Sequence, residues 1–223
     1  MGYYQQLDAP KRRLVDKHLE LVIEANKTTN LTRIDSIDEA MTLHIEDSLS
    51  GLPEMNDAIE GLYGDLGSGA GYPGIPLAIA TGRKTLLIDA RQKKMNILAS
   101  IIQELELGDQ IDVYAGRAEL LAKTRSWEFS VLTARALSKL SVLLELASPL
   151  LRKNGSLICY KSHIEDEELK DALRVQELVG MKLESDRSFN LDEYERRIVT
   201  FKKVGKAKVR LPRQEGLAQK QPL

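Results

Sequence analysis

The chain has 223 residues and a formal net charge of −1, a length that accommodates one substantial domain with a small extension. Apolar residues make up 43% of it and charged residues 29%, as in an ordinary globular protein, and no run approaches the ~18 to 20 consecutive apolar residues of a membrane-spanning helix. The N-terminal stretch MGYYQQLDAPKRR lacks the apolar core of a secretory signal, so we expect a cytoplasmic protein that does not enter a membrane.

Charge is unevenly distributed along the chain. Residues 196–223 contain nine Lys or Arg and one acidic residue, Glu215, so they carry +8 and the remainder of the chain carries −9. A basic tail on an acidic body is typical of a protein that binds a polyanion such as RNA, although a solvated tail without a partner has the same composition.

The first part of the chain is predicted to form a helical cap. Apolar residues recur at helical spacing over residues 11–27. A second helix is predicted over residues 36–52, because Ser36 and Glu39 have the spacing of a capping box, and we expect this helix to end at Pro53.

From Leu62 onward, apolar strands alternate with helices. The predicted strands cover residues 62–67, 84–90, 110–118, 129–136, 155–162, 181–189 and 196–204. The predicted helices between them cover residues 74–82, 91–108, 139–155 and 165–180. Strands separated by helices of this length pair in parallel through right-handed crossovers, and the last two strands form an antiparallel pair. We therefore predict an α/β fold with a doubly wound, mostly parallel seven-stranded sheet, divided into a helical cap (1–55), a main domain (56–204) and a basic tail (205–223).

The rare side chains offer little chemistry of their own. Cys159 lies in the apolar segment SLICY and is expected to be a small buried hydrophobe rather than a nucleophile. His18, His44 and His163 do not have the spacing of metal ligands, so no metal site is expected.

The stretch DLGSGAGYPGIP, residues 65–76, follows the first predicted strand, where an open parallel sheet binds ligands. Gly69, Gly71 and Gly74 spell G-x-G-x-x-G, the dinucleotide pattern. Gly67, Gly69 and Gly71 spell G-x-G-x-G. Both patterns use glycine because the backbone has to pass close to a ligand.

The neighbours of these glycines favour the second pattern. A dinucleotide site presents backbone N–H groups to a pyrophosphate, but Pro73 and Pro76 remove two of these donors. The Asp65 carboxylate is a poor neighbour for a pyrophosphate and attracts a cationic amino-acid moiety that carries an ammonium and a sulfonium. The dinucleotide pattern is weakened and not excluded.

Two further positions indicate a nucleoside. Asp89 ends the second predicted strand, where a carboxylate accepts hydrogen bonds from both ribose hydroxyls; capping of the next helix is the alternative. Ala118 and Glu119 lie at the end of the third predicted strand, where a backbone N–H and a carboxylate fit an adenine edge. For this pair taken alone, a plain loop acid is the better explanation.

The order of several short motifs resembles one bacterial enzyme family. NLTRID and HIEDSL precede DLGSGAGYPGIPLAIA, and LIDARQKKMNIL, GRAE, ARA and YKS follow it. This arrangement, over about residues 20 to 220, is similar to the small-subunit ribosomal RNA methyltransferase G family, also called glucose-inhibited division protein B. The combination is much more specific than the glycine loop alone.

The resemblance implies a class I methyltransferase fold and an enzyme that uses S-adenosylmethionine to methylate N7 of a guanosine in 16S ribosomal RNA, with S-adenosylhomocysteine as the second product. It places Gly67 and Tyr72 against the methyl donor and Asp89 against its ribose. Ala118 and Glu119 then contact its adenine. The complete expected cofactor set is Asp65, Gly67, Gly69, Gly71, Tyr72, Asp89, Ala118, Glu119 and Arg135. Tyr72 stands where the family usually has an aliphatic residue.

Methylation at guanine N7 needs no general base, because N7 has an in-plane lone pair and no proton to lose. The enzyme has to align N7 with the methyl group, an orientation effect worth ~7 kcal/mol or more. Arg135 and Lys161 are the catalytic candidates at the carboxyl end of the sheet. The candidates for RNA contact are Asn30, Thr32, His44, Asp47, Ser48, Arg196 and Arg197. For His44 and Asp47, a hydrogen-bonded pair that fixes the cap to the sheet is the alternative.

Two other functions remain open. A non-catalytic RNA-binding protein can retain the cofactor fold, and an NAD-dependent oxidoreductase fits the dinucleotide pattern. For the methyltransferase, the expected partner is 16S ribosomal RNA or the 30S ribosomal particle, and we expect a monomer.

Overall fold

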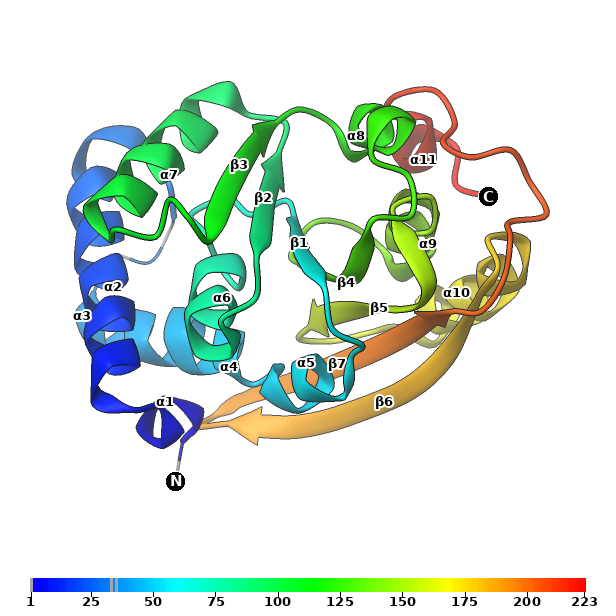
Figure 1. Ribbon diagram of the computed structural model, residues 1–223. Helices are drawn as coiled ribbons and strands as arrows, with labels where there is room; N and C mark the ends of the chain where they lie inside the picture. Colours follow the sequence, from blue (N-terminus) through cyan, green and yellow to red (C-terminus); the bar gives the residue numbers. More distant parts are fainter. Residues whose placement is uncertain (1, 33, 35) are drawn as a thin grey trace.

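The computed structural model describes residues 2–32, 34 and 36–223. In this part of the chain the strands form one seven-stranded sheet with the order β3-β2-β1-β4-β5-β7-β6 (Figure 1). The strands are β1 (Leu62–Leu66), β2 (Thr85–Asp89), β3 (Ile111–Ala115), β4 (Phe129–Arg135), β5 (Leu151–Lys161), β6 (Met181–Leu191) and β7 (Tyr194–Lys203). The first five pair in parallel, and β7 runs antiparallel to β5 and β6. The predicted doubly wound, mostly parallel sheet is confirmed, and its strand order reverses between β1 and β4.

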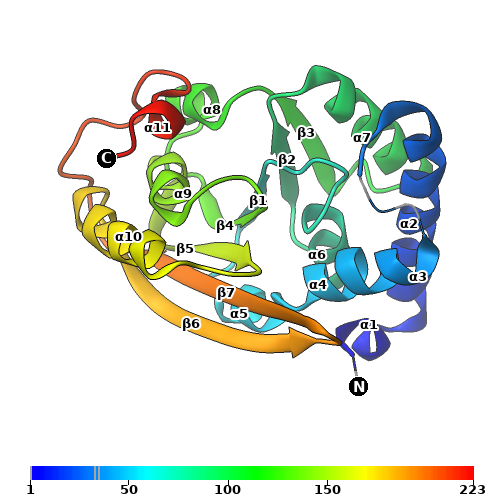
Figure 2. The ribbon, with the colours of Figure 1, turned by 180° about the vertical axis from the view of Figure 1, so that it is seen from behind.

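Helices cover both faces of the sheet. They are α1 (Tyr3–Gln6), α2 (Ala9–Thr29), α3 (Ile37–Ala40), the π-helical turn η1 (Met41–Glu46), α4 (Asp47–Leu49), α5 (Leu52–Asp57), α6 (Gly74–Thr81), α7 (Gln92–Glu104), α8 (Ala118–Thr124), α9 (Leu140–Ala147), α10 (Asp166–Leu178) and α11 (Leu217–Lys220). One face packs against α6 and α7, with α2 outside them, and the other packs against α8, α9 and α10 (Figures 1 and 2). The helical cap lies beside the carboxyl end of β1, next to the loop that connects β1 to α6.

The burial of the central strands explains why their positions can be predicted from the sequence. All residues of β2 are buried, and so are all residues of β4 before Arg135. Continuous apolar strands of this kind occur in parallel sheets with helices on both faces. The edge strand β6 instead alternates and exposes polar side chains, which discourages pairing with another chain.

One predicted helix is wrong at its C-terminal end. The sequence pattern indicates a helix up to Gly155, but α9 ends at Ala147 and β5 begins at Leu151. Pro149 has no N–H for the helical hydrogen-bond ladder, and Leu150 is fully buried after it. The apolar run that the sequence pattern assigns to one helix thus forms the end of α9 and the start of β5.

Two other predicted boundaries are also wrong. The sequence predicts that a helix ends at Pro53, but Leu52 begins α5 and the proline lies in its first turn, where the missing N–H costs nothing. The predicted third strand extends to Ala118, but β3 ends at Ala115 and Ala118 begins α8.

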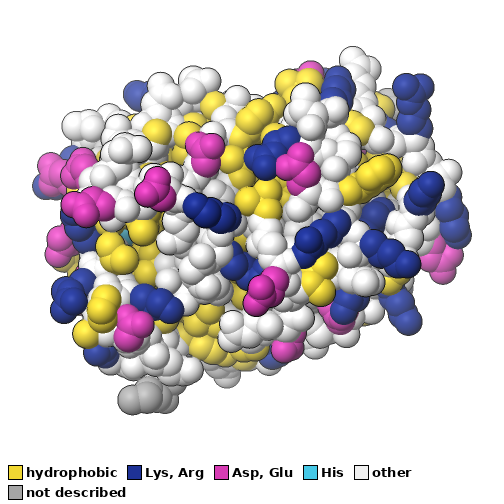
Figure 3. All heavy atoms as spheres, viewed as in Figure 1, with side chains coloured by type: hydrophobic (Ala, Val, Ile, Leu, Met, Phe, Trp, Pro, Cys, Tyr) yellow, Lys and Arg dark blue, Asp and Glu magenta, His cyan; other side chains and the backbone are white. Residues whose placement is uncertain are grey.

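The C-terminal segment, residues 205–223, folds back beside α9 and α10. Lys208 N donates to Leu178 O at 2.7 Å. Arg213 forms a two-pronged ion pair with Glu145, and α11 packs against α9. Figure 3 shows Lys and Arg side chains gathered at the end of the molecule that carries this segment. The basic tail is therefore folded onto the body of the protein.

Candidate active site

The loop between β1 and α6 forms the edge of the candidate site. Gly67, Gly69 and Gly71 have φ angles of +74°, +56° and +91°, in the left-handed region that glycine adopts without strain. At Gly67, an added Cβ would also lie 2.8 Å from Leu137 Cδ1. The turn geometry and this close approach explain the spacing of the glycines.

Hydrogen bonds tie the loop to the end of β2. Gly67 N donates to Ile88 O at 2.7 Å, and Ile88 N donates to Ser68 Oγ at 3.1 Å. Gly69 N donates to Asp89 Oδ2 at 3.1 Å. Asp89 therefore holds the loop in place in addition to lining a cavity beside it.

Asp89 is a buried carboxylate that stays charged. Its Oδ1 accepts from Arg91 N at 2.9 Å and from Arg91 Nε at 3.2 Å. Burial opposes the charge, but the hydrogen bonds from Arg91 and Gly69 outweigh it and lower the pKa of Asp89 below its ordinary value. Arg91 is the N-cap residue of α7, so Asp89 precedes the cap of that helix and does not form it.

A cavity of about 260 Å³, here called the nucleoside cavity, opens beside Asp89 at the carboxyl ends of β1 and β2. Gly67, Asp89, Ala118 and Glu119 all line it. Its apolar walls include Leu66, Ile88, Leu137 and Leu146. Glu119 is buried, and its Oε1 accepts from Gly216 N at 2.8 Å. The structure thus brings together the residues expected at ribose and adenine.

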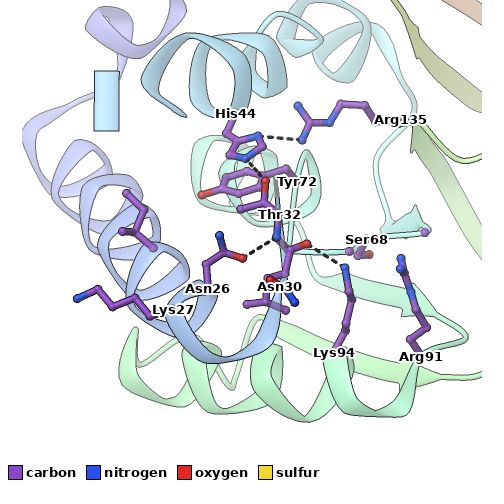
Figure 4. A pocket seen from close by; sticks show the side chains of 16 residues that line it. Asn26, Lys27, Asn30, Thr32, His44, Ser68, Tyr72, Arg91, Lys94 and Arg135 are labelled. Carbon is purple, nitrogen blue, oxygen red and sulfur yellow. Dashed lines mark hydrogen bonds between the residues drawn. The ribbon is translucent and has the colours of Figure 1, made fainter. Parts of the chain in front are cut away.

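A larger cavity of about 980 Å³, here called the cap cavity, lies between the glycine loop and the helical cap (Figure 4). Gly69 and Tyr72 line it from the loop, and Arg135 lines it from the end of β4. The cap contributes Asn26, Lys27, Asn30, Thr32 and His44. Gly67 and Arg91 line both cavities, so the two spaces meet at the loop.

Asp65 lies beneath the loop and lines neither cavity, and the same holds for Gly71. Thr133 Oγ1 donates to Asp65 Oδ1 at 2.7 Å, whereas Oδ2 has no hydrogen-bond partner among the described residues. Burial raises the pKa of Asp65 to about 6, against the effect of the Thr133 hydrogen bond. A Cβ at Gly74 would lie 2.8 Å from Oδ2, so α6 begins directly on this carboxylate.

A chain of hydrogen bonds runs from the cap to the sheet (Figure 4). Thr32 N donates to Asn26 Oδ1 at 2.9 Å, and Thr32 Oγ1 lies 2.8 Å from His44 Nε2. Arg135 Nη2 donates to His44 Nδ1 at 3.4 Å. Because arginine only donates, Nδ1 is the acceptor and the proton of the neutral ring is on Nε2, directed at Thr32. Burial and the nearby Arg135 lower the pKa of His44 to about 4, so the ring is neutral at pH 7.

Asp47 connects two arginines across the same junction. Arg135 Nη1 donates to Asp47 Oδ2 at 2.8 Å and also to Leu43 O at 2.8 Å. Arg196 Nε donates to Asp47 Oδ1 at 2.8 Å. His44 is linked to Asp47 through Arg135, which ties η1 and α4 to β4 and β7.

Tyr72 packs among the side chains of this junction. Its ring stacks on His44 with centroids 4.4 Å apart and tilts against His18 at 4.7 Å. Arg135 Cζ lies 5.7 Å from the ring centroid. Burial raises the pKa of the Tyr72 hydroxyl and lowers that of His18 to about 3. The aromatic residue at this position thus supports the His44 ring from below (Figure 4).

The candidate RNA cations of the sheet are all ion-paired. Lys161 Nζ lies 2.5 Å from Glu168 Oε1. Arg197 donates to both oxygens of Asp186 at 2.7 and 2.6 Å. Lys161 and Arg196 line a third cavity of about 470 Å³, together with Arg135, His44 and Asp47. Arg197 lines a separate depression next to it, which Arg196 shares.

Asn30 and Ser48 differ in their access to a ligand. Asn30 follows the last residue of α2 with φ +49° and lines the cap cavity. Ser48 is fully buried, and its Oγ donates to His44 O. Tyr160 Oη donates to Ser48 O at 2.7 Å, so Ser48 belongs to the packing between the cap and β5.

Residues 11–199 match the family model of GidB, described as rRNA small subunit methyltransferase G. The chain belongs to this family. A ribosomal RNA small subunit methyltransferase G of Thermotoga petrophila is 34% identical over 225 residues, covering 100% of this chain and 96% of the relative. Its counterpart in Carboxydothermus hydrogenoformans is 35% identical over 222 residues, covering 97% and 94%.

Solved structures that share the fold include several methyltransferases. The O-methyltransferase from Bacillus cereus in complex with SAH aligns with a TM-score of 0.58 and 19% identity, covering 83% of this chain and 90% of that one. Geranyl diphosphate C-methyltransferase from Streptomyces coelicolor A3(2) aligns with a TM-score of 0.57 and 9% identity, covering 71% and 80%. At these identities the likeness shows the fold alone, which is the class I methyltransferase fold expected from the resemblance.

Some residues that line the two cavities in this family member were not indicated by its motifs. Lys94 Nζ donates to Leu31 O at 2.9 Å, and burial lowers the pKa of Lys94. Lys94 does lie in the motif LIDARQKKMNIL, but only Asp89 of that motif has a predicted role. Gln219 lines the nucleoside cavity from α11, far along the chain from Glu119, and no sequence pattern connects the two.

The remaining expectations concern chemistry outside this site. Cys159 is fully buried, and burial raises the pKa of its thiol to about 12, as expected of a buried hydrophobe. No helix in the described ranges has the length and apolar character to cross a membrane. Within those ranges, no group of three or more His, Cys, Asp or Glu is arranged to hold a metal ion.

Proposed function

We propose that the protein transfers the methyl group of S-adenosylmethionine to N7 of a guanosine in 16S ribosomal RNA. One observation carries the choice of cofactor: Gly67 and Arg91 line both the nucleoside cavity and the cap cavity. A ligand with a nucleoside at one end and an amino acid at the other fits across this loop. Family membership supports ribosomal RNA of the small subunit as the acceptor.

The chemistry of the nucleoside cavity fits adenosine. Asp89 accepts four hydrogen bonds, two of them from the Arg91 side chain, which is exposed. Two ribose hydroxyls can take the place of that side chain, and Glu119 offers an acceptor for an exocyclic amino group. The backbone N–H of Ala118, at the start of α8, suits a ring nitrogen. Two carboxylates in one small cavity disfavour a pyrophosphate, which argues against a dinucleotide.

The methyl acceptor is assigned to the cap cavity, where Arg135 and His44 also border the third cavity. Bound S-adenosylmethionine supplies a methyl carbon activated by a positive sulfur, and N7 accepts it without a base. The described hydrogen bonds of Arg135 use three of its five N–H groups. The other two, on Nε and Nη2, are available to orient a guanine oxygen or a phosphate, while Asp47 and His44 hold the guanidinium in place.

A transfer assay tests the proposal. Radiolabelled S-adenosylmethionine is incubated with unmodified 16S RNA or 30S particles, and the labelled base is mapped. Label at N7 of one guanosine is the expected result. Cofactor binding without label in either substrate would leave a non-catalytic RNA-binding protein, and tight NADH binding would overturn the choice of cofactor.

A further inference from the structure

The C-terminal segment reaches the nucleoside cavity. Gly216 N donates to Glu119 Oε1 at 2.8 Å, and both residues are buried. Gly216 has a φ of +71°, which glycine adopts without strain. One oxygen of the Glu119 carboxylate is thus held by the segment, which leaves Oε2 to accept from a ligand.

Contacts with α9 fix the segment in this position. Arg213 donates to Glu145 from Nε at 2.7 Å and from Nη2 at 2.6 Å, and the Glu145 side chain is only 4% exposed. Ala218 is buried against Val142 and Leu146. Leu146 also lines the nucleoside cavity, so α11 and the cavity share α9 as their support.

Gln219 forms part of the cavity wall together with Asp89, Ala118 and Glu119. We infer that the C-terminal segment belongs to the nucleoside site: the Gly216 N–H positions the Glu119 carboxylate, and the Gln219 side chain binds the purine edge. An amide offers both donors and an acceptor, which match the amino group and ring nitrogens along that edge. The inference rests on the proposed function, and the ligand is the purine nucleoside carried by the methyl donor.

Replacement of the amide tests the contact directly. In the full-length protein, Gln219→Ala is expected to weaken S-adenosylhomocysteine binding about 5-fold by calorimetry, as for one hydrogen bond. Gln221→Ala is the matched control, because Gln221 has the same side chain, is exposed and does not line the cavity. It should bind as the unmodified protein does. Equal affinities of Gln219→Ala and the unmodified protein would overturn the contact.

Hydrogen exchange on the unmodified protein tests the positioning role. Saturating S-adenosylhomocysteine is expected to slow exchange of backbone amides in residues 214–221, alongside those of residues 67–72. Protection of residues 67–72 without protection of residues 214–221 would show that the C-terminal segment does not belong to the nucleoside site. If the unmodified protein binds no S-adenosylhomocysteine at all, the proposed function fails instead.

Discussion

Arg135 makes hydrogen bonds to His44, Asp47 and Leu43 O from one guanidinium group. This requires a planar group with several fixed donors, which lysine does not have. The contacts belong to the cap, whereas Arg135 itself ends β4. The residue therefore sets the position of the cap relative to the glycine loop and keeps two donors for a ligand.

Replacing Arg135 by lysine is expected to damage methyl transfer more than cofactor binding. Loss of two charge-assisted hydrogen bonds corresponds to ~3 kcal/mol, or about 100-fold in kcat/KM with the RNA substrate. S-adenosylhomocysteine affinity should change less, since Arg135 does not line the nucleoside cavity and only the amino-acid end of that ligand reaches the cap cavity that Arg135 lines. Arg125→Lys is the control, because Arg125 pairs with Glu128 at the other end of β4. An unchanged kcat/KM for Arg135→Lys would contradict this role.

Asp65 predicts a specific pH dependence of stability. Burial raises its pKa in the folded protein to about 6 from an ordinary 3.8, so the folded state keeps its proton to higher pH than the unfolded chain does. Raising the pH from about 4 to above 6 therefore costs the folded state up to ~3 kcal/mol at this residue. Asp65→Asn does not titrate, so its stability relative to the unmodified protein should improve over that interval, as measured by urea unfolding at pH 4 and pH 7. A constant difference between the two proteins would refute the prediction.

At the scale of elements, the sequence predicts the site residues whose position is determined by the order and direction of the strands. The glycine loop follows β1, Asp89 ends β2, and Ala118 and Glu119 begin the helix after β3. Parallel strands end at one edge of the sheet, so these positions meet there. What sequence did not reveal is side-chain direction: Asp65 precedes the same glycines, yet it points under the loop. The boundary of α9 was missed because an apolar run has no period that separates a buried helix from a buried strand.

The C-terminal segment is the element that the sequence described least well. The charge of residues 196–223 indicates a tail for a polyanion, whereas Arg213 is paired with Glu145 in the structure. Lys203, which ends β7, is buried as well, with Nζ donating to Ser148 Oγ and Val179 O. Charge counts do not show which cations have partners. The segment therefore combines an anchored part and an exposed part.

The anchor can be tested at Arg213. Arg213→Gln is expected to lower the free energy of unfolding by roughly 2 to 3 kcal/mol, because Glu145 is left buried without its partner, and to weaken S-adenosylhomocysteine binding through α11. Arg213→Lys keeps the positive charge, so it should lower the free energy of unfolding and the S-adenosylhomocysteine affinity less than Arg213→Gln does. Arg210→Gln makes the same change at an exposed neighbour and serves as the control. If Arg213→Gln and Arg210→Gln behave alike in urea unfolding and calorimetry, the ion pair does not hold the segment.

For the whole molecule, the exposed part of the segment presents a row of positive charge. Lys206, Lys208 and Arg210 are exposed and alternate with the half-buried Ala207 and Val209, in an irregular stretch that bends at Lys208 and Val209. Lys208 Nζ lies 3.9 Å from Glu177 Oε2, and both side chains are exposed. The cations nearer the site form closer and more buried ion pairs, such as Arg196 with Asp47 at 2.8 Å. Long-range attraction of RNA is thus expected to come from the row, and positioning from the site.

Replacing the three cations of this row by alanine is expected to weaken RNA binding and to lower the slope of log affinity against log salt by about 2. S-adenosylhomocysteine affinity should stay unchanged, because none of the three lines the nucleoside cavity. Filter binding across a salt series provides the measurement. An unaltered slope would make the row a solvated surface without a role in RNA binding.

The walls of the nucleoside cavity run from Leu66 to Gln219, so residues far apart in the sequence enclose one small space. The wall at Gln219 is present only while α11 is docked on α9. A nucleoside that binds the complete cavity therefore also stabilises the docking of α11, by linkage between the two equilibria.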